Sequence, residues 1–202
     1  MKDLLIIFTR NPQLGKCKTR LAATVGDRAA LEIYKFLLKH TADVAGKVNA
    51  VRHVYYSEEI GTNDIWDDKQ FEKRQQMGSH LGIRMQQAFE NGFAAGFERI
   101  LLIGSDLYDL GPSDLNSAFE ALDHHDFVLG PAEDGGYYLI GSRKVKKEVF
   151  ERKNWGTETV LRDTLSDLEG ESLFLLPERN DVDVYEDIQH IEVFQQFLND
   201  LK

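Results

Sequence analysis

The chain has 202 residues, of which 42% are hydrophobic and 29% are charged, a composition typical of a globular protein in water. Its formal net charge of −10 argues against binding to a nucleic-acid backbone, and its single cysteine, Cys17, excludes an intrachain disulfide. A chain of this length buries roughly 70% of its unfolded surface on folding, so it needs neither disulfides nor metals to fold.

The first apolar run, residues 4–8, is too short for a signal peptide or a membrane-spanning helix, and it predicts a first β-strand. We therefore expect a cytoplasmic enzyme or binding protein without a membrane span.

Strand-like runs and segments of helical spacing alternate along the chain. Strands are predicted at 3–8, 49–56, 69–76 (a short edge strand), 99–106, 126–129, 137–140 and 172–176. Between and after them, helices are predicted after Gly26, at 82–97, from 111 to 122, from a Thr157 cap to Leu168, and at 184–198. This alternation predicts one α/β domain, a sheet with helices on both sides.

The strand predicted at 99–106 contains four consecutive aliphatic residues, 100–103, which indicates burial on both faces within a parallel sheet. It stops at Gly104, Ser105 and Asp106. Ligands of open α/β sheets bind at the carboxyl ends of the strands, so Asp106 is a candidate functional group. The segment alone supports equally well a structural role for Asp106 in the following turn.

The loop after the first strand carries Arg10, Lys16, Lys18 and Arg20, and no acidic residue lies between positions 10 and 20. It lacks both the dinucleotide-binding glycine pattern and the P-loop pattern. A glycine-containing loop with alternating basic residues can bind a diphosphate through backbone N–H groups and charged side chains. A solvated basic loop is the alternative, but the position after the first strand favours binding of a small anionic ligand.

A second polar segment contains Glu133, Asp134, Gly135, Gly136 and Tyr137 between two apolar runs. Adjacent glycines allow a ligand to approach the backbone, tyrosine can pack on a sugar or base, and a carboxylate can accept a hydroxyl proton. For the two glycines a hairpin turn is an equally good explanation. For Asp134 we favour a functional role.

These motifs, residues 9–21, 103–106 and 130–141, resemble in sequence and order a family of small GT-A-type proteins. These are nucleotide-diphospho-sugar transferase-like proteins, some of them described as glycosyltransferases of arsenosugar biosynthesis. Residues 76–85, 155–157 and 181–187 also resemble that family, so the likeness covers nearly the whole chain. Molybdenum-cofactor and phospholactate guanylyltransferases are more distant relatives of the family. Its members commonly have a proline where this chain has Tyr108, which predicts a different shape for the loop after Asp106.

The resemblance implies a three-layer α/β/α fold of GT-A type with a mostly parallel mixed sheet, forming a single nucleotide-sugar-binding domain over residues 1–202. It implies a metal-dependent glycosyltransferase that moves a sugar from a nucleoside diphosphate sugar to a small acceptor. The alternatives are a nucleotidyltransferase that releases pyrophosphate and a non-catalytic nucleotide-binding protein.

The same resemblance assigns candidate site residues. Asp106, Asp134 and Lys18 are the candidate catalytic groups. The nucleotide diphosphate would be bound by Thr9, Arg10, Gly15, Lys18, Arg20 and Ser105, and the acceptor or sugar by Glu133, Asp134, Gly135, Gly136 and Tyr137. Mg²⁺ or Mn²⁺ would be held by Asp106, with Asp181 or Asp183 as second ligand and Asp183 as our choice. A capping box formed by Asp183 and Glu186 competes with that role, and the spacing favours it.

Overall fold

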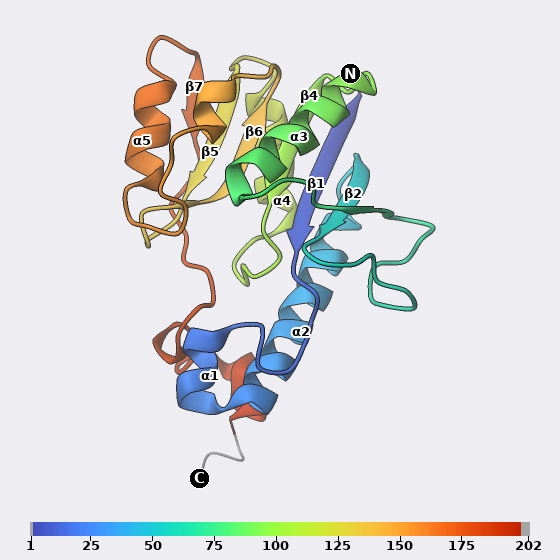
Figure 1. Ribbon diagram of the computed structural model, residues 1–202, viewed down its shortest axis with the longest axis vertical. Coiled ribbons are helices and arrows are strands. Elements are labelled where there is room, and N and C mark those ends of the chain that lie inside the picture. The colour runs from blue at the N-terminus through green and yellow to red at the C-terminus, as the bar shows by residue number, and fades with distance from the viewer. Residues whose placement is uncertain (1, 199–202) are drawn as a thin grey trace.

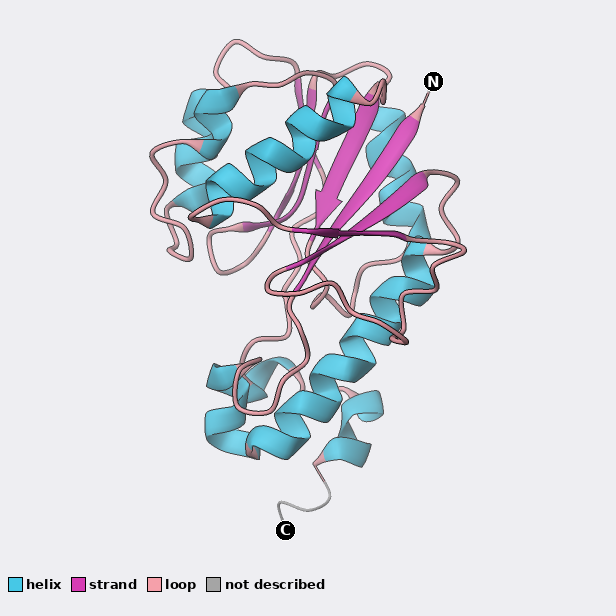
Figure 2. Cartoon of the chain, turned by 45° about the vertical axis from the view of Figure 1, so that its right-hand side comes forward, coloured by secondary structure: helices cyan, strands magenta, loops and turns pink. Residues whose placement is uncertain are grey.

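The computed structural model describes residues 2–198, which form a seven-stranded sheet in the order β3-β2-β1-β4-β6-β5-β7 (Figures 1 and 2). The strands are β1 Asp3–Thr9, β2 Val51–Tyr56, β3 Glu72–Gln75, β4 Arg99–Ile103, β5 Phe127–Pro131, β6 Tyr137–Ser142 and β7 Leu173–Leu175. The α-helices are α1 Thr19–Val25, α2 Asp27–Ala45, α3 Leu81–Ala94, α4 Pro112–Ala121 and α5 Val160–Asp167. Short 3₁₀ helices are η1 Lys147–Phe150, η2 Tyr185–Asp187 and η3 Glu192–Phe197.

The sheet is mostly parallel. β1 pairs in parallel with β2 and β4, whereas β6 runs antiparallel to both β4 and β5. Helices cover both faces of this mixed sheet, as Figure 2 shows. The predicted three-layer α/β/α fold of GT-A type is confirmed.

The side chains of β1 alternate between two buried clusters. Leu5 and Ile7 pack with α2 and α4 on one face, and Leu4 and Ile6 pack with α3 and η1 on the other. A strand buried on both faces consists of nearly continuous apolar residues, as the run at 4–8 does. We refer to the sheet and the helices on its two faces as the sheet body.

A smaller group of helices lies beyond the carboxyl ends of β1 and β4 (Figure 1). We define this helical lobe as residues 19–37 and 182–198. It has its own buried cluster, formed by Leu21, Val25, Ala30, Ile33, Leu37, Val182, Ile188, Phe194 and Leu198. Helix α2 belongs to both regions, because several of its side chains pack instead against the sheet, namely Tyr34, Leu38, Ala42, Val44 and Ala45.

Tyr108 links the loop after β4 to the helical lobe. Its ring centroid lies 5.1 Å from that of Phe194, 6.0 Å from that of Phe36 and 5.0 Å from that of His40. The position that is commonly proline in the resembling family is thus an aromatic contact in this chain.

The continuous helix predicted at 184–198 is wrong, because the segment forms η2 and η3 with a break between them. Ile188, Ile191, Phe194 and Phe197 are spaced three residues apart, and all pack in or against the lobe cluster. A 3₁₀ helix places every third residue on one side, so the same apolar pattern fits this tighter geometry.

Two predicted caps are also wrong. Asp187 Oδ2, and not Asp183, accepts hydrogen bonds from the backbone N–H groups of Asp183 and Val184, at 2.8 and 2.7 Å. Thr157 does not cap α5, which begins at Val160, because its hydroxyl donates to the carbonyl oxygen of Asn154 instead. In addition, α1 is a helix that the sequence analysis does not predict, although Leu21 and Val25 have helical spacing and are both buried.

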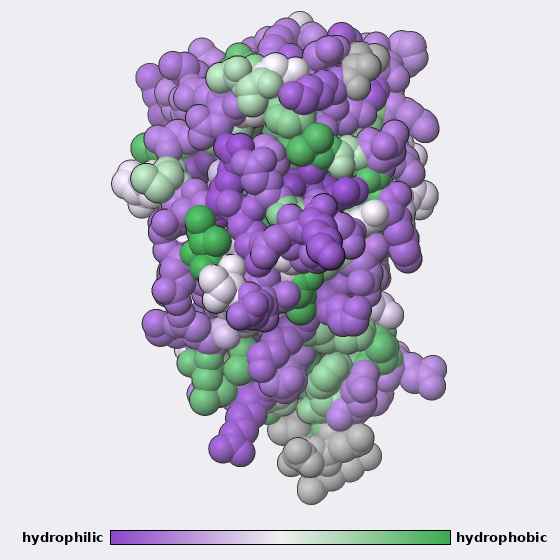
Figure 3. Space-filling view, turned by 90° about the vertical axis from the view of Figure 1, so that its right-hand side faces the viewer, coloured by the Kyte–Doolittle hydropathy of each residue, from purple (hydrophilic) through white to green (hydrophobic). Residues whose placement is uncertain are grey.

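The surface facing the viewer in Figure 3 is largely hydrophilic, and its hydrophobic side chains form separate small patches. No helix among residues 2–198 is long and apolar enough to cross a membrane.

Candidate functional site

The three motifs of the sequence meet at one edge of the sheet. β1 and β4 are parallel and end there, and β6 is antiparallel to β4, so the turn that precedes β6 lies at the same edge. Two adjoining pockets open at this edge and share Asp106, Asp134 and Asp181 among their lining residues. We call the one lined by Arg10, Lys18, Arg20 and Arg84 the basic pocket, and the one lined by Leu102, Tyr137 and Trp155 the apolar pocket.

Lys18 is the central cation of the basic pocket. Its side chain is only 6% exposed, and its Nζ lies 2.8 Å from Oδ2 of Asp106 and 4.0 Å from Oδ1 of Asp183. Burial lowers the pKa of the Lys18 ammonium, but attraction to Asp106, and more weakly to Asp181 and Asp183, outweighs burial and raises the pKa overall. Lys18 therefore places a stable positive charge between two carboxylates.

Arg20 and Asp183 form the outer part of the same charge cluster. Arg20 Nη1 donates to Asp183 Oδ2 at 2.7 Å, while the Arg20 side chain remains largely exposed. The side chain of Asp183 is therefore directed toward cations of the basic pocket rather than toward the backbone of η2.

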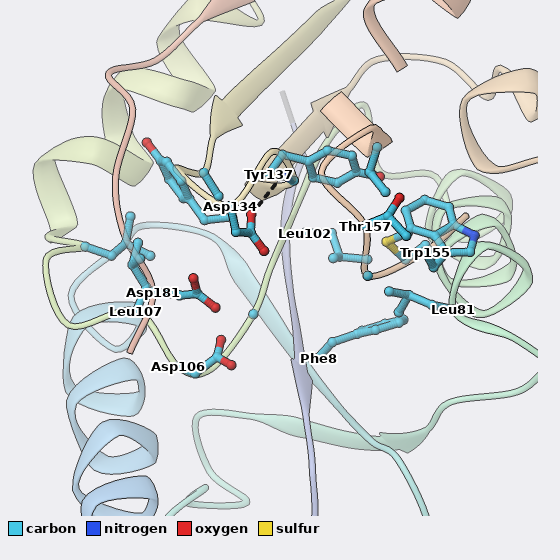
Figure 4. Close-up of a pocket in the computed structure, with 18 residues that line it drawn as sticks. Phe8, Leu81, Leu102, Asp106, Leu107, Asp134, Tyr137, Trp155, Thr157 and Asp181 are labelled. Carbon is cyan, nitrogen blue, oxygen red and sulfur yellow. Dashed lines mark hydrogen bonds between the residues drawn. The ribbon is translucent and has the colours of Figure 1, made fainter. Parts of the chain in front are cut away.

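Asp181 lies close to Asp106 because the chain passes directly alongside it, with the backbone N–H of Val182 donating to the carbonyl oxygen of Asp106 at 3.2 Å. Burial, and then repulsion from Asp106, Asp134 and Asp183, raise the pKa of Asp181 to about 6, although Lys18 opposes the shift. A carboxyl group that titrates near neutral pH thus faces the junction of the two pockets (Figure 4).

A buried hydroxyl network joins the ends of β1 and β4. Ser105 Oγ lies 3.3 Å from both the Thr9 hydroxyl and the Tyr34 hydroxyl. The Tyr34 oxygen also accepts from the backbone N–H of Arg10 at 3.0 Å and lies 3.2 Å from the Arg10 carbonyl oxygen. Ser105 therefore bonds to both Thr9 and Tyr34, and this network fixes the start of the basic loop.

Tyr34 carries no signal of this role in the sequence. It lies on the apolar face of a helix, where its spacing with Ile33, Leu37 and Leu38 indicates a core residue, and it is indeed buried. Only the fold places its hydroxyl against loops that are distant in sequence.

Arg84 joins the basic pocket through Gln76. The Gln76 amide donates to the carbonyl oxygens of Thr9 and Tyr55, at 3.2 and 3.0 Å, and its own oxygen lies 3.4 Å from Nη1 of Arg84. Both residues occur in the segment 76–85 of the family-like sequence, which indicated no individual role for either.

The turn between β5 and β6 contributes Asp134, whose Oδ1 accepts from the backbone N–H of Gly136 at 2.8 Å. Gly135 has φ +83°, and a Cβ there would lie 2.3 Å from the carbonyl oxygen of Glu158, so the turn requires glycine for packing. Glu133 and Gly135 lie outside both pockets, whereas Asp134, Gly136 and Tyr137 line the apolar one. Gly15 is exposed and also lies outside both pockets.

The apolar pocket extends from the carboxylates toward aromatic walls. Figure 4 shows Asp106, Asp134 and Asp181 on one side, and Trp155 and Leu81 on the other. Tyr137 and Trp155 meet edge to face, with ring centroids 6.3 Å apart. Burial raises the pKa of the Tyr137 hydroxyl, which has no hydrogen-bond partner among the described residues, so its ring rather than its oxygen is what the pocket presents.

Within residues 2–198, no three His, Cys, Asp or Glu side chains are arranged to hold a metal ion. The two carboxylates that sequence reasoning assigned to a metal, Asp106 and Asp183, flank the Lys18 ammonium instead.

Comparison with known proteins gives a family match over residues 40–157, to the bacterial family DUF2064, whose description reads "uncharacterized protein conserved in bacteria". The chain belongs to this family. No match was found among curated proteins.

A solved structure from Desulfovibrio desulfuricans, of a candidate nucleotide-diphospho-sugar transferase, is similar to this member of DUF2064. The two share 29% identity with a TM-score of 0.85, over 99% of this chain and 95% of the other. The predicted resemblance to nucleotide-diphospho-sugar transferase-like proteins is confirmed.

Two more distant structures share the fold alone. A cytidylyltransferase from Leptospira borgpetersenii is 14% identical, with a TM-score of 0.60, over 93% of this chain and 83% of the other. A 4-diphosphocytidyl-2C-methyl-D-erythritol synthase from Anaerococcus prevotii is 10% identical, with a TM-score of 0.60, over 96% of each chain.

Proposed function

We propose that this DUF2064 protein is a glycosyltransferase that moves a sugar from a nucleoside diphosphate sugar to a small, uncharged acceptor. One observation carries the proposal. Within residues 2–198, a pocket lined by four cationic side chains and four aspartates adjoins a pocket whose charged lining residues are three of those aspartates and no cation. The cations distinguish the two pockets, so the first suits an anionic substrate and the second an uncharged one, with the reacting groups meeting at Asp106 and Asp134.

The diphosphate of the donor would occupy the basic pocket. Arg10, Arg20 and Arg84 can form paired hydrogen bonds with phosphate oxygens, and Lys18 supplies a compact charge beside Asp106. The similarity to the Desulfovibrio protein supports a nucleotide-diphospho-sugar as the donor class. The hydroxyls of Thr9 and Ser105 would position the basic loop after β1 rather than contact the donor, since they are bonded within the buried network.

A divalent cation would be held by Asp106 and Asp183, whose carboxylate oxygens are ligands that Mg²⁺ and Mn²⁺ prefer. The Lys18 ammonium lies between these two carboxylates, so binding of the cation would require Lys18 to move. When bound, the cation would offset the negative charge that develops on the leaving diphosphate.

In the proposed reaction the acceptor hydroxyl oxygen forms a bond to the anomeric carbon of the donor sugar. The bond between that carbon and the phosphate oxygen breaks, and its electron pair leaves with the nucleoside diphosphate. The hydroxyl proton passes to the carboxylate of Asp134, which the Gly136 N–H holds in position and which is exposed enough to release the proton to water. The cations of the basic pocket stabilise the leaving diphosphate.

Nucleotidyl transfer is the second candidate, because the basic pocket would also hold a triphosphate and the fold is shared with cytidylyltransferases. That reaction uses an acceptor phosphate as the nucleophile. A phosphate in the apolar pocket would face Asp106, Asp134 and Asp181 without a lining cation among the described residues. Like charges repel strongly in partly buried sites, so this arrangement favours glycosyl transfer.

The decisive experiment incubates the protein with Mg²⁺ or Mn²⁺, a panel of nucleoside diphosphate sugars and triphosphates, and a mixture of neutral alcohols and their phosphorylated counterparts as acceptors. Release of a nucleoside diphosphate together with a glycosylated alcohol is the expected result. Release of pyrophosphate would establish nucleotidyl transfer instead. Binding of nucleotide without turnover of any donor would indicate a non-catalytic binding protein.

A further inference from the structure

We infer that the apolar pocket selects an acceptor alcohol with an apolar body, such as an aromatic or aliphatic alcohol, over a sugar, a polyol or an anionic acceptor. The inference rests on the proposed function, since it names the acceptor class of that same site. It goes further because it derives the chemical class of the acceptor from the side chains that line the pocket.

The walls come from three separate parts of the fold. Leu102 of β4 and Tyr137 of β6 come from the sheet, Leu81 and Met85 from α3, and Trp155 and Val160 from the segment that enters α5. Leu81 is 42% exposed although it is a large apolar residue at the mouth of the pocket. An apolar ligand would cover this surface, and removal of apolar area from water is favourable.

Away from the three carboxylates, the walls offer few hydrogen bonds to a sugar. The Tyr137 hydroxyl and Trp155 Nε1 are buried, and neither can reach a ligand without a rearrangement. The Thr157 hydroxyl already donates to the Asn154 carbonyl oxygen at 2.8 Å. Sugar hydroxyls that lie against these walls would therefore lose water without gaining partners, which is costly, whereas a single reactive hydroxyl can lie at the carboxylate end.

Charge excludes the anionic acceptors. The charged lining residues of the apolar pocket among residues 2–198 are Asp106, Asp134 and Asp181. A phosphorylated or carboxylated acceptor would bring a further negative charge beside them. An uncharged alcohol avoids this repulsion and presents its hydroxyl to Asp134, as the proposed reaction requires.

The test measures binding of three small probes to the unsubstituted protein by ligand-observed NMR, with neither nucleotide nor metal present. Benzyl alcohol is the apolar alcohol, benzoate is its anionic counterpart, and glycerol is the polyol. We expect benzyl alcohol to bind at least tenfold more tightly than either of the others. Equal affinity for glycerol, or for benzoate, would overturn the inference.

Substitution then locates the binding. Trp155→Ala should weaken the binding of benzyl alcohol at least tenfold. The control is Phe174→Ala, which removes a 39%-exposed ring of β7 outside both pockets and should leave the affinity unchanged. Equal weakening by both variants would contradict the assignment.

If circular dichroism shows Trp155→Ala to be unfolded, Trp66→Phe replaces it. This variant retains Trp155 as the sole tryptophan, because the chain has two. Quenching of its fluorescence by 4-nitrobenzyl alcohol, but not by 4-nitrobenzoate, is then expected, and equal quenching by both would overturn the inference. Because these measurements need no turnover, failure of sugar transfer and failure of apolar binding remain distinguishable.

Discussion

The sheet body and the helical lobe are built in different ways and contribute different halves of the charged site. The sheet body is formed by strands whose apolar side chains alternate between two faces, and it supplies Asp106 and Asp134. The lobe combines α1 and α2 with a segment from the other end of the chain, and it carries Arg20 and Asp183. Lys18, at the start of α1, reaches across to Asp106. The charged site therefore depends on contacts between two separately packed regions, and so would the proposed reaction.

Matched substitutions in the two cores should separate their stabilities. Phe194 in the lobe and Phe89 in the sheet body are both fully buried, and replacement of either by alanine should destabilise its region by about 3–5 kcal/mol. Phe194→Ala should increase amide hydrogen exchange in residues 19–37 and 182–198 while β1 and β4 stay protected. Phe89→Ala should increase exchange throughout the sheet. If Phe194→Ala also increases amide hydrogen exchange in β1 and β4, the two regions unfold as one unit.

Loss of the Lys18–Asp106 ion pair, which joins the two regions, should have the largest effect on turnover. Asp106→Asn removes the charge that pairs with Lys18 and one of the carboxylates proposed to hold the cation, so release of nucleoside diphosphate should fall by about 10²–10³-fold. The matched control is Asp123→Asn, which removes a carboxylate that pairs with Arg99 away from both pockets. The control should keep the rate of the unsubstituted protein. Undiminished turnover in Asp106→Asn would remove Asp106 from the mechanism.

The raised pKa of Asp181 predicts that the free energy of unfolding depends on pH. Its value of about 6 lies above the ordinary value of about 4, so the folded chain binds the proton more tightly than the unfolded chain. Stability from this group is therefore greatest at low pH and is lost as the pH rises from about 4 through 6. Asp181→Asn should be more stable than the unsubstituted chain by about 2 kcal/mol at pH 8, and the difference should shrink toward pH 4. Urea unfolding at both pH values measures it, and a pH-independent difference would contradict the assignment.

The smallest effect is expected at the hydroxyl network. Tyr34→Phe removes the group that joins Arg10 to Ser105 and should cost about 1 kcal/mol of stability. Because the basic loop loses its support, KM for the donor should rise several-fold with less change in kcat. Tyr56→Phe is the control, since its hydroxyl bonds to Asp64 outside both pockets. A similar loss of stability without a change in KM is expected there, and equal KM effects would refute a positioning role for Tyr34.

Local sequence patterns predict the strands of the sheet body but not the C-terminal part of the lobe. Apolar runs such as 4–8 and 100–103 predict buried strands because a central parallel strand has few other solutions. In the lobe, the spacing of Ile188, Ile191 and Phe194 fits an α-helix and a 3₁₀ helix equally well, and packing against α1 and α2 decides between them. The break between η2 and η3 could not be derived from the segment itself.

The residues of the site also divide into those that local sequence patterns predict and those that they do not. Asp106, Asp134 and Lys18 are found from motifs, because each follows a strand or a glycine-containing loop at a predictable edge of the sheet. Tyr34 and Arg84 lie on helices whose local pattern explains them fully as core and surface residues. Their approach to the basic pocket depends on how α2 and α3 pack on the sheet, which no local pattern encodes.

The ring of Tyr108 attaches the loop that carries Asp106 to the core of the lobe. It contacts Phe36 and Phe194, whose own ring centroids lie 5.5 Å apart, so the three rings form one aromatic cluster. Tyr108→Pro removes the ring contacts of the loop and should therefore loosen the lobe.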